Sequence, residues 1–521
     1  MDIPANHMTG DNRPLAGFRA ASFLRDCRTI VMMAAVVAAV LGGCAMREAK
    51  DAGTSLITYD APKEIAASPF YTVAVNGRPV FVYPCQVGTI VDDKGNLIPN
   101  RHELTAPAPA AFCSFDFSGQ VEVAVTVKGP ALHLPLRSAI VRPLRHGIQP
   151  KVTEATLRFS LDRPCSLSVE PNGAIAAPLF VFANPLEEQR PRPEDPGVVY
   201  FPPGVHDLNS RGPVRPNTTI YIAGGAVVYG QLDAENVSGV RVKGRGILDA
   251  SRCAGGRQMR WFKCRDIVVE GIVMLDSPSW GIEVTHCDDV RIRNVKIITG
   301  RGADAIDVCS SENVIVEQVF ARTHDDTLNV KGLTDLAFGY PADKDGHWLP
   351  TGNRKAARNI RFTDCVVWND RAHALMIGPE TRTPVIEDVV FKNIEVIHAL
   401  SVHALAIFSG DAGVIRRIRY EGIRIEDPRC QDLFGIRIHP TYVSADPHCG
   451  PVYDVLYKDI DVSMTSPVYS GFCGDSNEIS RVRFENLRIN GKIVTSAEEA
   501  RLIVRGKVSD VRFVTSGQRP D

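Results

Sequence analysis

The sequence predicts an all-β protein in which a small β-sandwich domain precedes a right-handed parallel β-helix. Three observations indicate this fold class. A short strand led by Val or Ile recurs through most of the chain, mostly at intervals of 23–29 residues. A second apolar position follows five residues later, often after Gly or Asn, and a third strand completes the unit. Three short strands in a unit of this length are typical of a coil that must stack on its neighbours to bury its apolar face.

The repeat defines the strands of the expected helix. First strands begin at Val240, Ile267, Val290, Val314, Ile360, Val389, Ile418, Val455, Val482 and Val511. Third strands include Gly281-Ile-Glu-Val, Ala305-Ile-Asp-Val, Thr327-Leu-Asn-Val, Ala374-Leu-Met-Ile, Ala404-Leu-Ala-Ile and Gly435-Ile-Arg-Ile. A leucine-rich repeat is disfavoured because Leu does not dominate and no helical segment recurs. A β-propeller needs four antiparallel strands per blade, and these intervals are too short for that.

Upstream of the repeat, residues 55–187 are expected to form the β-sandwich domain. Short alternating segments such as Val121-Glu-Val-Ala-Val-Thr-Val127 are separated by turn pairs such as Asn76-Gly77, which favours an antiparallel arrangement. Residues 188–197 form a Pro-rich, charged linker, and residues 198–515 form the parallel β-helix. We expect the sandwich to support the helix by packing, with sugar binding as the alternative.

The N-terminus is expected to be a targeting segment. An apolar run, Ile30 to Leu41, follows Arg25 and Arg28 and is too short to span a bilayer as a stable helix. The ending Leu41-Gly-Gly-Cys44 resembles a bacterial lipoprotein signal, so residues 1–44 are interpreted as a signal peptide and residues 45–54 as a tether. That resemblance implies export, acylation of Cys44 and anchoring to the outer membrane. A plain secretion signal or a short anchor is the alternative.

Composition limits the partners and cofactors. Lys plus Arg is 59 and Asp plus Glu is 60, and no basic patch with interleaved aromatic residues points to nucleic acid. The 13 cysteines have irregular spacing and include no pair with zinc spacing. We therefore expect no nucleic-acid partner, no metal and no cofactor.

Polar residues gather at one phase of the repeat. Aligning the third strands places a column just before them, made of Trp280, Asp304, Asp326, His373, His403 and Phe434. A second, outward column is Glu283, Asp307, Asn329, Met376, Ala406 and Arg437. Coils stack at the strand spacing of about 4.8 Å, so carboxyl groups in neighbouring coils repel and at least one is expected to keep its proton. Glycosidic cleavage needs this pairing of a carboxylic acid with a carboxylate that activates water.

These residues resemble glycoside hydrolase family 28, the polygalacturonases, in Asp304-Ala-Ile-Asp307, then Asp325-Asp326, then Ala372-His373-Ala. The resemblance implies a pectin-lyase-like solenoid and inverting hydrolysis without a metal. By similarity, Asp325 is the general acid, Asp304 and Asp326 hold and deprotonate the water, and His373 orients the site. The domain order also resembles the family 49 dextranases.

The sequence departs from the family 28 pattern where substrate is bound. The Arg-Ile-Lys motif that binds galacturonate has no counterpart in the strand after His373, and Gly435-Ile-Arg437-Ile-His439 resembles it one coil too late. A neutral sugar therefore stays possible. The candidate substrate-binding residues are Asp307, Lys331, His403, Arg437 and Trp280. Structural roles are the alternatives for some of these residues. Asp304 and Asp307 could hold a calcium ion between them, and Trp280 could form a wall of the groove.

Four functions are compatible with these residues. An inverting glycoside hydrolase, polygalacturonase-like and acting on a polysaccharide or oligosaccharide, is preferred, with a dextranase-like hydrolase of a neutral glycan next to it. A polysaccharide lyase would need a Lys or Arg base, and no cation lies in the column of acids and imidazoles. A non-catalytic carbohydrate-binding lipoprotein would carry the acids as remnants.

Overall fold

The computed structural model describes residues 53–88, 107–130, 133–300, 302–336, 352–446 and 448–515. Residues Thr54–Asp521 form one compact unit. The expected signal peptide and Cys44 lie outside the described residues. No helix within the described ranges is long and apolar enough to cross a membrane. The predicted fold class, an all-β chain built on a parallel β-helix, is confirmed, while the exact domain boundaries stay a prediction.

The first part of the compact unit is a sandwich of two sheets. One sheet has the order β1-β5-β11-β10-β7, with β4 added beside β5, and the other has the order β3-β2-β6-β9-β8. The strands are β1 (Ser55–Thr58), β2 (Tyr71–Val75), β3 (Arg78–Val80), β4 (Val82–Val87), β5 (Ala108–Ser118), β6 (Val121–Val127), β7 (Ala139–Arg142), β8 (Lys151–Thr153), β9 (Thr156–Leu161), β10 (Cys165–Pro171) and β11 (Leu179–Asn184). The sheets bury Val, Leu and Phe side chains between them. One pair departs from the antiparallel expectation, because β11 runs parallel to β5.

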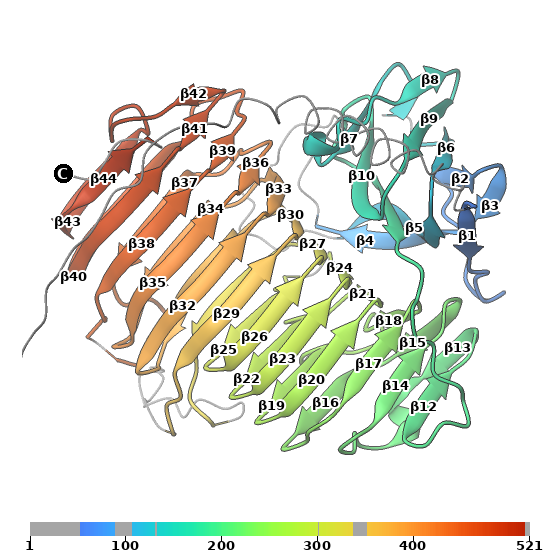
Figure 1. Cartoon of the computed structure of the whole chain (residues 1–521), viewed down its shortest axis with the longest axis horizontal. Coiled ribbons are helices and arrows are strands. Elements are labelled where there is room, and N and C mark those ends of the chain that lie inside the picture. Colours follow the sequence, from blue (N-terminus) through green and yellow to red (C-terminus); the bar gives the residue numbers. More distant parts are fainter. Residues whose placement is uncertain are drawn as a thin grey trace, which may run out of the picture. The chain divides into compact units, whose positions relative to one another are not determined.

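The second part is a solenoid of three parallel ladders, whose strands run side by side from β12 to β44 (Figure 1). The first ladder contains β12 (Val198–Phe201), β14 (Thr219–Ile222), β17 (Arg241–Gly244), β20 (Arg265–Glu270), β23 (Asp288–Arg293), β26 (Glu312–Glu317), β29 (Ala357–Thr363), β32 (Val385–Lys392), β35 (Val414–Glu421), β38 (Val452–Lys458), the end of β40 (Tyr469–Glu485) and β44 (Val511–Val514).

The second ladder contains β13 (Gly204–Asp207), β15 (Ala226–Tyr229), β18 (Ile247–Asp249), β21 (Val273–Leu275), β24 (Lys296–Ile298), β27 (Phe320–Thr323), β30 (Val366–Asn369), β33 (Glu395–Ala399), β36 (Arg424–Ile425), β39 (Asp461–Val462) and β41 (Arg488–Ile489), with β42 (Lys492–Ile493) antiparallel at its end. The third contains β16 (Leu232–Glu235), β19 (Met259–Phe262), β22 (Ile282–Thr285), β25 (Ile306–Cys309), β28 (Leu328–Gly332), β31 (His373–Thr381), β34 (His403–Ser409), β37 (Asp432–Ile438), the start of β40, and β43 (Leu502–Val508). The described residues also include the short 3₁₀ helices η2 (Leu144–His146) and η3 (Leu208–Arg211).

The Gly and Asn residues of the repeat make the corners between the first and second strands. Gly271, Asn294, Asn393, Gly422 and Asn486 all have positive φ, between 53° and 84°. Gly and Asn are the residues that reach the left-handed region at least cost. Inside the solenoid, equivalent positions of successive coils bury the same kind of side chain. One such column is a stack of aromatic rings at centroid distances of 4.6–5.1 Å, made of Phe362, Phe391, Tyr420, Tyr457, Phe484 and Phe513.

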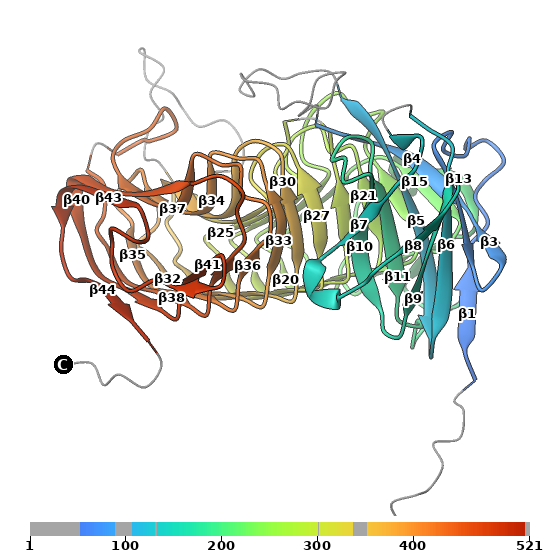
Figure 2. The ribbon, with the colours of Figure 1, turned by 90° about the horizontal axis from the view of Figure 1, so that it is seen from above.

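The sandwich packs on the second ladder of the solenoid. Figure 1 shows β24, β27 and β30 on the side that faces the sandwich strands, and Figure 2 shows β27 and β30 next to β7 and β10. The contact has an apolar centre, where Phe180 and Phe182 of β11 meet Phe320 of β27 and Trp368 of β30. Side chains of this size each contribute roughly 1.5–3 kcal/mol when they are fully buried. The two parts are therefore joined by a shared core.

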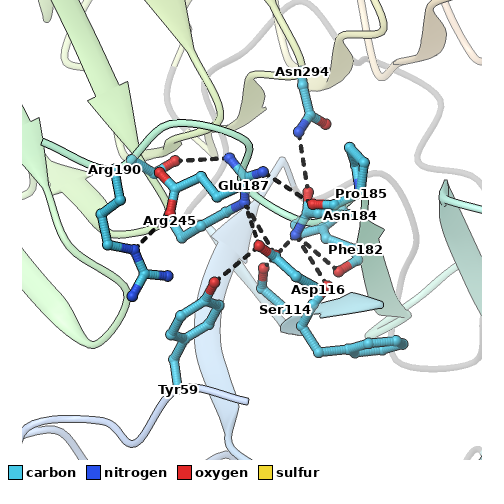
Figure 3. A network of polar contacts seen from close by, with 12 residues as sticks. Tyr59, Ser114, Asp116, Phe182, Asn184, Pro185, Glu187, Arg190, Arg245 and Asn294 are labelled. Atoms are coloured by element: carbon cyan, nitrogen blue, oxygen red, sulfur yellow. Dashed lines mark hydrogen bonds and ion pairs between the residues drawn. The ribbon is translucent and has the colours of Figure 1, made fainter. Parts of the chain in front are cut away.

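A polar network closes one end of this contact (Figure 3). Arg245, which follows β17, is 7% exposed and donates from Nε to both carboxylate oxygens of Asp116 on β5, at 3.0 Å each. Its Nη2 donates to the carbonyl of Pro185 at 3.1 Å, and Tyr59 donates its hydroxyl to Asp116 Oδ2 at 2.9 Å. A buried charge is tolerated when it is paired and hydrogen-bonded in this way.

Candidate active site

The third ladder brings the predicted acids and imidazoles together, because each lies at the start of its third strand. Backbone bonds link Gly281 N to Asp304 O at 2.8 Å, Ala305 N to Asp326 O at 2.9 Å, and Thr327 N to His373 O at 2.9 Å. His373 then pairs with His403 in the next coil. Asp304, Asp326, His373 and His403 thus occupy consecutive rungs, and their side chains lie one strand spacing apart.

Asp326 and His373 form the tightest pair in the site. His373 Nδ1 lies 2.5 Å from Asp326 Oδ1, and Asn329 Nδ2 donates to Asp326 Oδ2 at 2.9 Å. Burial alone would raise the pKa of Asp326, but the charge and hydrogen bond of His373 outweigh it, so the pKa lies below its usual value. Asp326 is therefore a carboxylate that stays ionised.

Asp325 differs from its neighbour in exposure and in charge. Its side chain is 37% exposed, against 7% for Asp326. Its backbone carbonyl accepts hydrogen bonds from Asn369 Nδ2 at 2.6 Å and Thr323 Oγ1 at 3.0 Å, which fix the turn. Although part of the side chain is exposed, the protein surrounds the carboxyl group closely enough that desolvation, together with the Asp326 charge, raises the pKa of Asp325. Adjacent residues thus give one carboxyl group that retains its proton more readily and one that does not.

Asp304 and Asp307 share a cation. Lys331 Nζ lies 3.0 Å from Asp304 Oδ2 and 3.1 Å from Asp307 Oδ1, and Glu380 Oε2 is 3.9 Å away. Burial and the Asp307 charge raise the pKa of Asp304 well above its usual value, although Lys331 opposes this. Burial raises the pKa of Asp307 to about 6. Lys331 is charged, because these carboxylates raise its pKa despite its burial.

Trp280 lies beside this cluster, between two cations. Lys331 Nζ is 4.0 Å from the centroid of its ring, and Arg257 Cζ is 3.8 Å from it. Arg257 is in turn held by Glu283, with Nε 2.8 Å from Oε2. The indole is half-buried. Trp280 therefore packs on the cluster, whether or not it also contacts a sugar.

At the other end of the column, the expected alignment of β37 was wrong by two residues. The structure pairs Leu405 with Phe434 and Phe408 with Arg437. Asp432 therefore takes the place expected for Phe434 and pairs with His403, with 3.1 Å between Oδ2 and Nε2. A slip of two residues keeps every side chain on its own face of the strand, so the apolar pattern could not reveal it.

His403 and Arg437 are both engaged with this missed acid. The His403 ring stacks on His373 with centroids 5.2 Å apart, and burial lowers the pKa of His403 to about 4. Arg437 Nη2 lies 3.1 Å from Asp432 Oδ2. Asp432 and Glu380 are the site residues that the columns did not contain. Glu380, for which the sequence favoured a loop acid over a substrate contact, lies on β31 seven residues after His373.

The arrangement can carry out acid–base chemistry on a bound molecule. It offers a half-exposed carboxyl group with a raised pKa, a carboxylate next to it with a lowered pKa, and a third acid one coil away. No group of three or more His, Cys, Asp or Glu side chains suited to holding a metal occurs in the described residues. That no metal or cofactor takes part stays a prediction.

Comparison with known proteins places the chain in a family. The model of the family described as "Glycosyl hydrolases family 28" matches residues 243–503. A probable endopolygalacturonase of Aspergillus fumigatus is 23% identical over 197 residues, which are 35% of this chain and 52% of that protein. A probable endopolygalacturonase of Neosartorya fischeri is 23% identical over 239 residues, which are 43% of this chain and 56% of that protein.

The match therefore spans about half the length of these curated relatives. Among solved structures, Dex49A from Penicillium minioluteum has a TM-score of 0.56 at 15% identity and covers 87% of this chain and 96% of its own. At that identity the likeness concerns the fold, and it extends over the sandwich as well as the solenoid. The family match covers half of the chain, from the solenoid's third coil almost to its end. The chain belongs to family 28 of the glycosyl hydrolases.

Proposed function

We propose that this protein is a polygalacturonase-like glycoside hydrolase that cleaves a polysaccharide or oligosaccharide by single displacement with inversion. The observation that carries the proposal is the position of Asp325 and Asp326 beside Asp304 on the neighbouring rung, with His373 Nδ1 2.5 Å from Asp326 Oδ1. These adjacent carboxyl groups have pKa values shifted in opposite directions, upward for Asp325 and downward for Asp326. Inverting hydrolysis needs such a pair, one group to donate a proton and one to accept one.

In this mechanism the proton of Asp325 goes to the leaving glycosidic oxygen as its bond to the anomeric carbon breaks. The oxygen of a water molecule forms the new bond to that carbon, and Asp326 takes its proton. Asp304 orients the water, and His373 keeps Asp326 ionised through the 2.5 Å contact between Nδ1 and Oδ1. Exchange with solvent returns the proton to Asp325. Family membership and the names of the relatives support the reaction class.

A neutral glycan is the second candidate substrate, and one observation favours it. Lys331 and Arg437, the two cations among the candidate substrate-binding residues, each lie within 3.1 Å of a carboxylate. The same contacts argue against a lyase with Lys331 as base, since its carboxylate neighbours hold the amine protonated. A carbohydrate-binding protein without activity is the remaining alternative.

A reducing-end assay on polygalacturonate and on α-glucans tests the proposal. Release of reducing ends from polygalacturonate supports a polygalacturonase, and release from an α-glucan supports the dextranase-like function. NMR of the first product formed then gives its anomeric configuration, which is expected to be inverted. An unsaturated product that absorbs in the ultraviolet would mean a lyase, and binding without cleavage would mean a binding protein.

We also propose that the protein is exported and anchored by a lipid on Cys44, on the outer membrane. The support is the apolar run that ends in Leu41-Gly-Gly-Cys44. Metabolic labelling with a palmitate analogue is expected to mark the wild type and not the Cys44→Ala variant. Incorporation of equal label into both would contradict the anchor.

A further inference from the structure

Lys331 is buried, and its amine lies among acidic side chains of this chain. Its side chain is 4% exposed and comes from β28, whose register sets it beside Cys309 of the preceding coil. From there Nζ reaches back to Asp304 and Asp307, and Glu380 of β31 approaches from the following coil. Three carboxylates from the two adjacent coils thus converge on one ammonium group of the coil between them.

An ammonium group has three N–H donors, and one of those of Lys331 is donated to Asp304. Asp304 accepts at 3.0 Å, Asp307 lies at 3.1 Å and Glu380 at 3.9 Å. The Trp280 ring lies 4.0 Å from Nζ and covers a further side. Lys331 Nζ is therefore surrounded by groups of this chain and is 4% exposed, whereas the sequence made it a candidate substrate-binding residue.

The negative charges around Lys331 indicate that its amine reduces the repulsion between neighbouring carboxylates. One cation faces three carboxylates directly, and Asp325 and Asp326 add further negative charge nearby. Without the cation, these buried carboxyl groups would repel one another with nothing to oppose them, and they would retain protons or move apart. The titratable groups that face Lys331 are Asp304, Asp307, Cys309, Asp325, Asp326, Glu380 and Tyr442.

We propose that Lys331 is a positioning residue, an internal countercharge that holds Asp304 and Asp307 in place and controls the acid limb of the pH–activity profile. It acts through Asp304 and does not itself touch the substrate. The predicted effect of Lys331 on the pH–activity profile rests on the proposed function. The electrostatic interaction of Lys331 with Asp304 and Asp307 does not depend on it.

Activity as a function of pH gives the first test. In Lys331→Met the acid limb of kcat is expected to move up by about one pH unit or more, because an opposite charge this close lowers a carboxyl pKa by about 1–3 units. KM should change less than twofold. Lys331→Arg keeps the charge and should restore the profile. Glu380→Gln removes a negative charge and should move the acid limb down.

A substrate-binding lysine would behave differently. Lys331→Met would then raise KM for polygalacturonate severalfold, leave the acid limb in place and spare neutral glycans. That result would overturn the proposal, and so would shifts of the same sign in Lys331→Met and Glu380→Gln. Lys263→Met is the matched control, because Lys263 also pairs with an acid, Asp335 at 3.2 Å, beside an aromatic ring, but is 38% exposed. Its profile should match the wild type.

Thermal unfolding as a function of pH tests the coupling without any substrate. In Lys331→Met the uncompensated carboxyl groups have raised pKa values in the folded state, so stability is expected to fall as pH rises from 4 to 8. The Tm difference from the wild type should therefore grow over that range, and should not grow for Lys263→Met. Parallel Tm curves would refute the coupling. If no tested glycan is cleaved, the proposed function fails. The thermal unfolding experiment still decides whether Lys331 acts as a countercharge.

Discussion

His398 offers a quantitative test of how the sandwich is attached to the solenoid. This fully buried residue of β33 places Nε2 2.8 Å from Glu170 Oε1 on β10 and Nδ1 2.9 Å from Asp427 Oδ2. Burial would lower the pKa of His398, but the charge of Glu170 and the hydrogen bonds to both acids raise it, against an opposing effect of Arg142. An imidazolium ion therefore bridges the two parts of the compact unit.

Replacing His398 with Gln leaves Glu170 and Asp427 without this cation. Removing one partner of a buried ion pair costs about 3–5 kcal/mol. Arg142 still pairs with Glu170 at 3.2 Å, and Arg429 still pairs with Asp427 at 2.9 Å, so we expect the lower end, a loss of about 3 kcal/mol in the free energy of unfolding near pH 6.

The sign of the pH dependence follows from the raised pKa. A group whose pKa is higher in the folded than in the unfolded state stabilises fully below the unfolded value of about 6.5. Its contribution is lost as pH rises through the folded pKa. The difference between wild type and His398→Gln should therefore be largest near pH 6 and decrease at alkaline pH.

Chemical denaturation monitored by circular dichroism at a series of pH values measures this difference. His448→Gln is the control, because the His448 side chain is 91% exposed beside Asp446, and it should change the free energy of unfolding by less than about 0.5 kcal/mol. A loss below about 1 kcal/mol in His398→Gln, or a loss independent of pH, would refute a charged bridge.

Two further predictions concern the site. His373→Gln should raise the pKa of Asp326 and lower kcat about tenfold or more at acidic pH, since a hydrogen bond to a charged group contributes about 1.5–3 kcal/mol; a pH–rate profile identical to the wild type would contradict this. Gly378→Ala should lower the free energy of unfolding by about 2 kcal/mol or more, because φ is +90° and an added Cβ would lie 2.0 Å from Phe408 O. It should also reduce activity by displacing Glu380, and unchanged denaturation curves would refute the close contact.

The solenoid could be predicted from the sequence because every coil repeats the same pattern of residues. Every coil needs apolar residues inside and a left-handed residue at the same corner, and Asn294 and Asn393 carry that signal openly. The phase of this repeat also brought Asp304 and Asp326 onto neighbouring rungs. Position in a repeat is a backbone property, and it can be counted along the chain.

The contacts made by long side chains could not be predicted from position in the repeat. Lys331 was predicted to bind substrate, and the sequence did not indicate that its amine also lies near Asp304 and Asp307 of the preceding coil. The place of Asp432 was missed because β37 slips by two residues, which leaves its alternation unchanged. The parallel pairing of β5 with β11 depends on chain connections that short-range pattern does not encode.

Turnover of the Asp325→Asn variant tests the central claim most directly. An amide cannot donate the proton that the leaving oxygen needs, and general acid catalysis contributes roughly 10²–10⁴-fold. We predict that Asp325→Asn loses at least about a hundredfold in kcat on the glycan that the wild type cleaves, with an unchanged Tm because the side chain is 37% exposed. Undiminished turnover by a folded Asp325→Asn variant would contradict it.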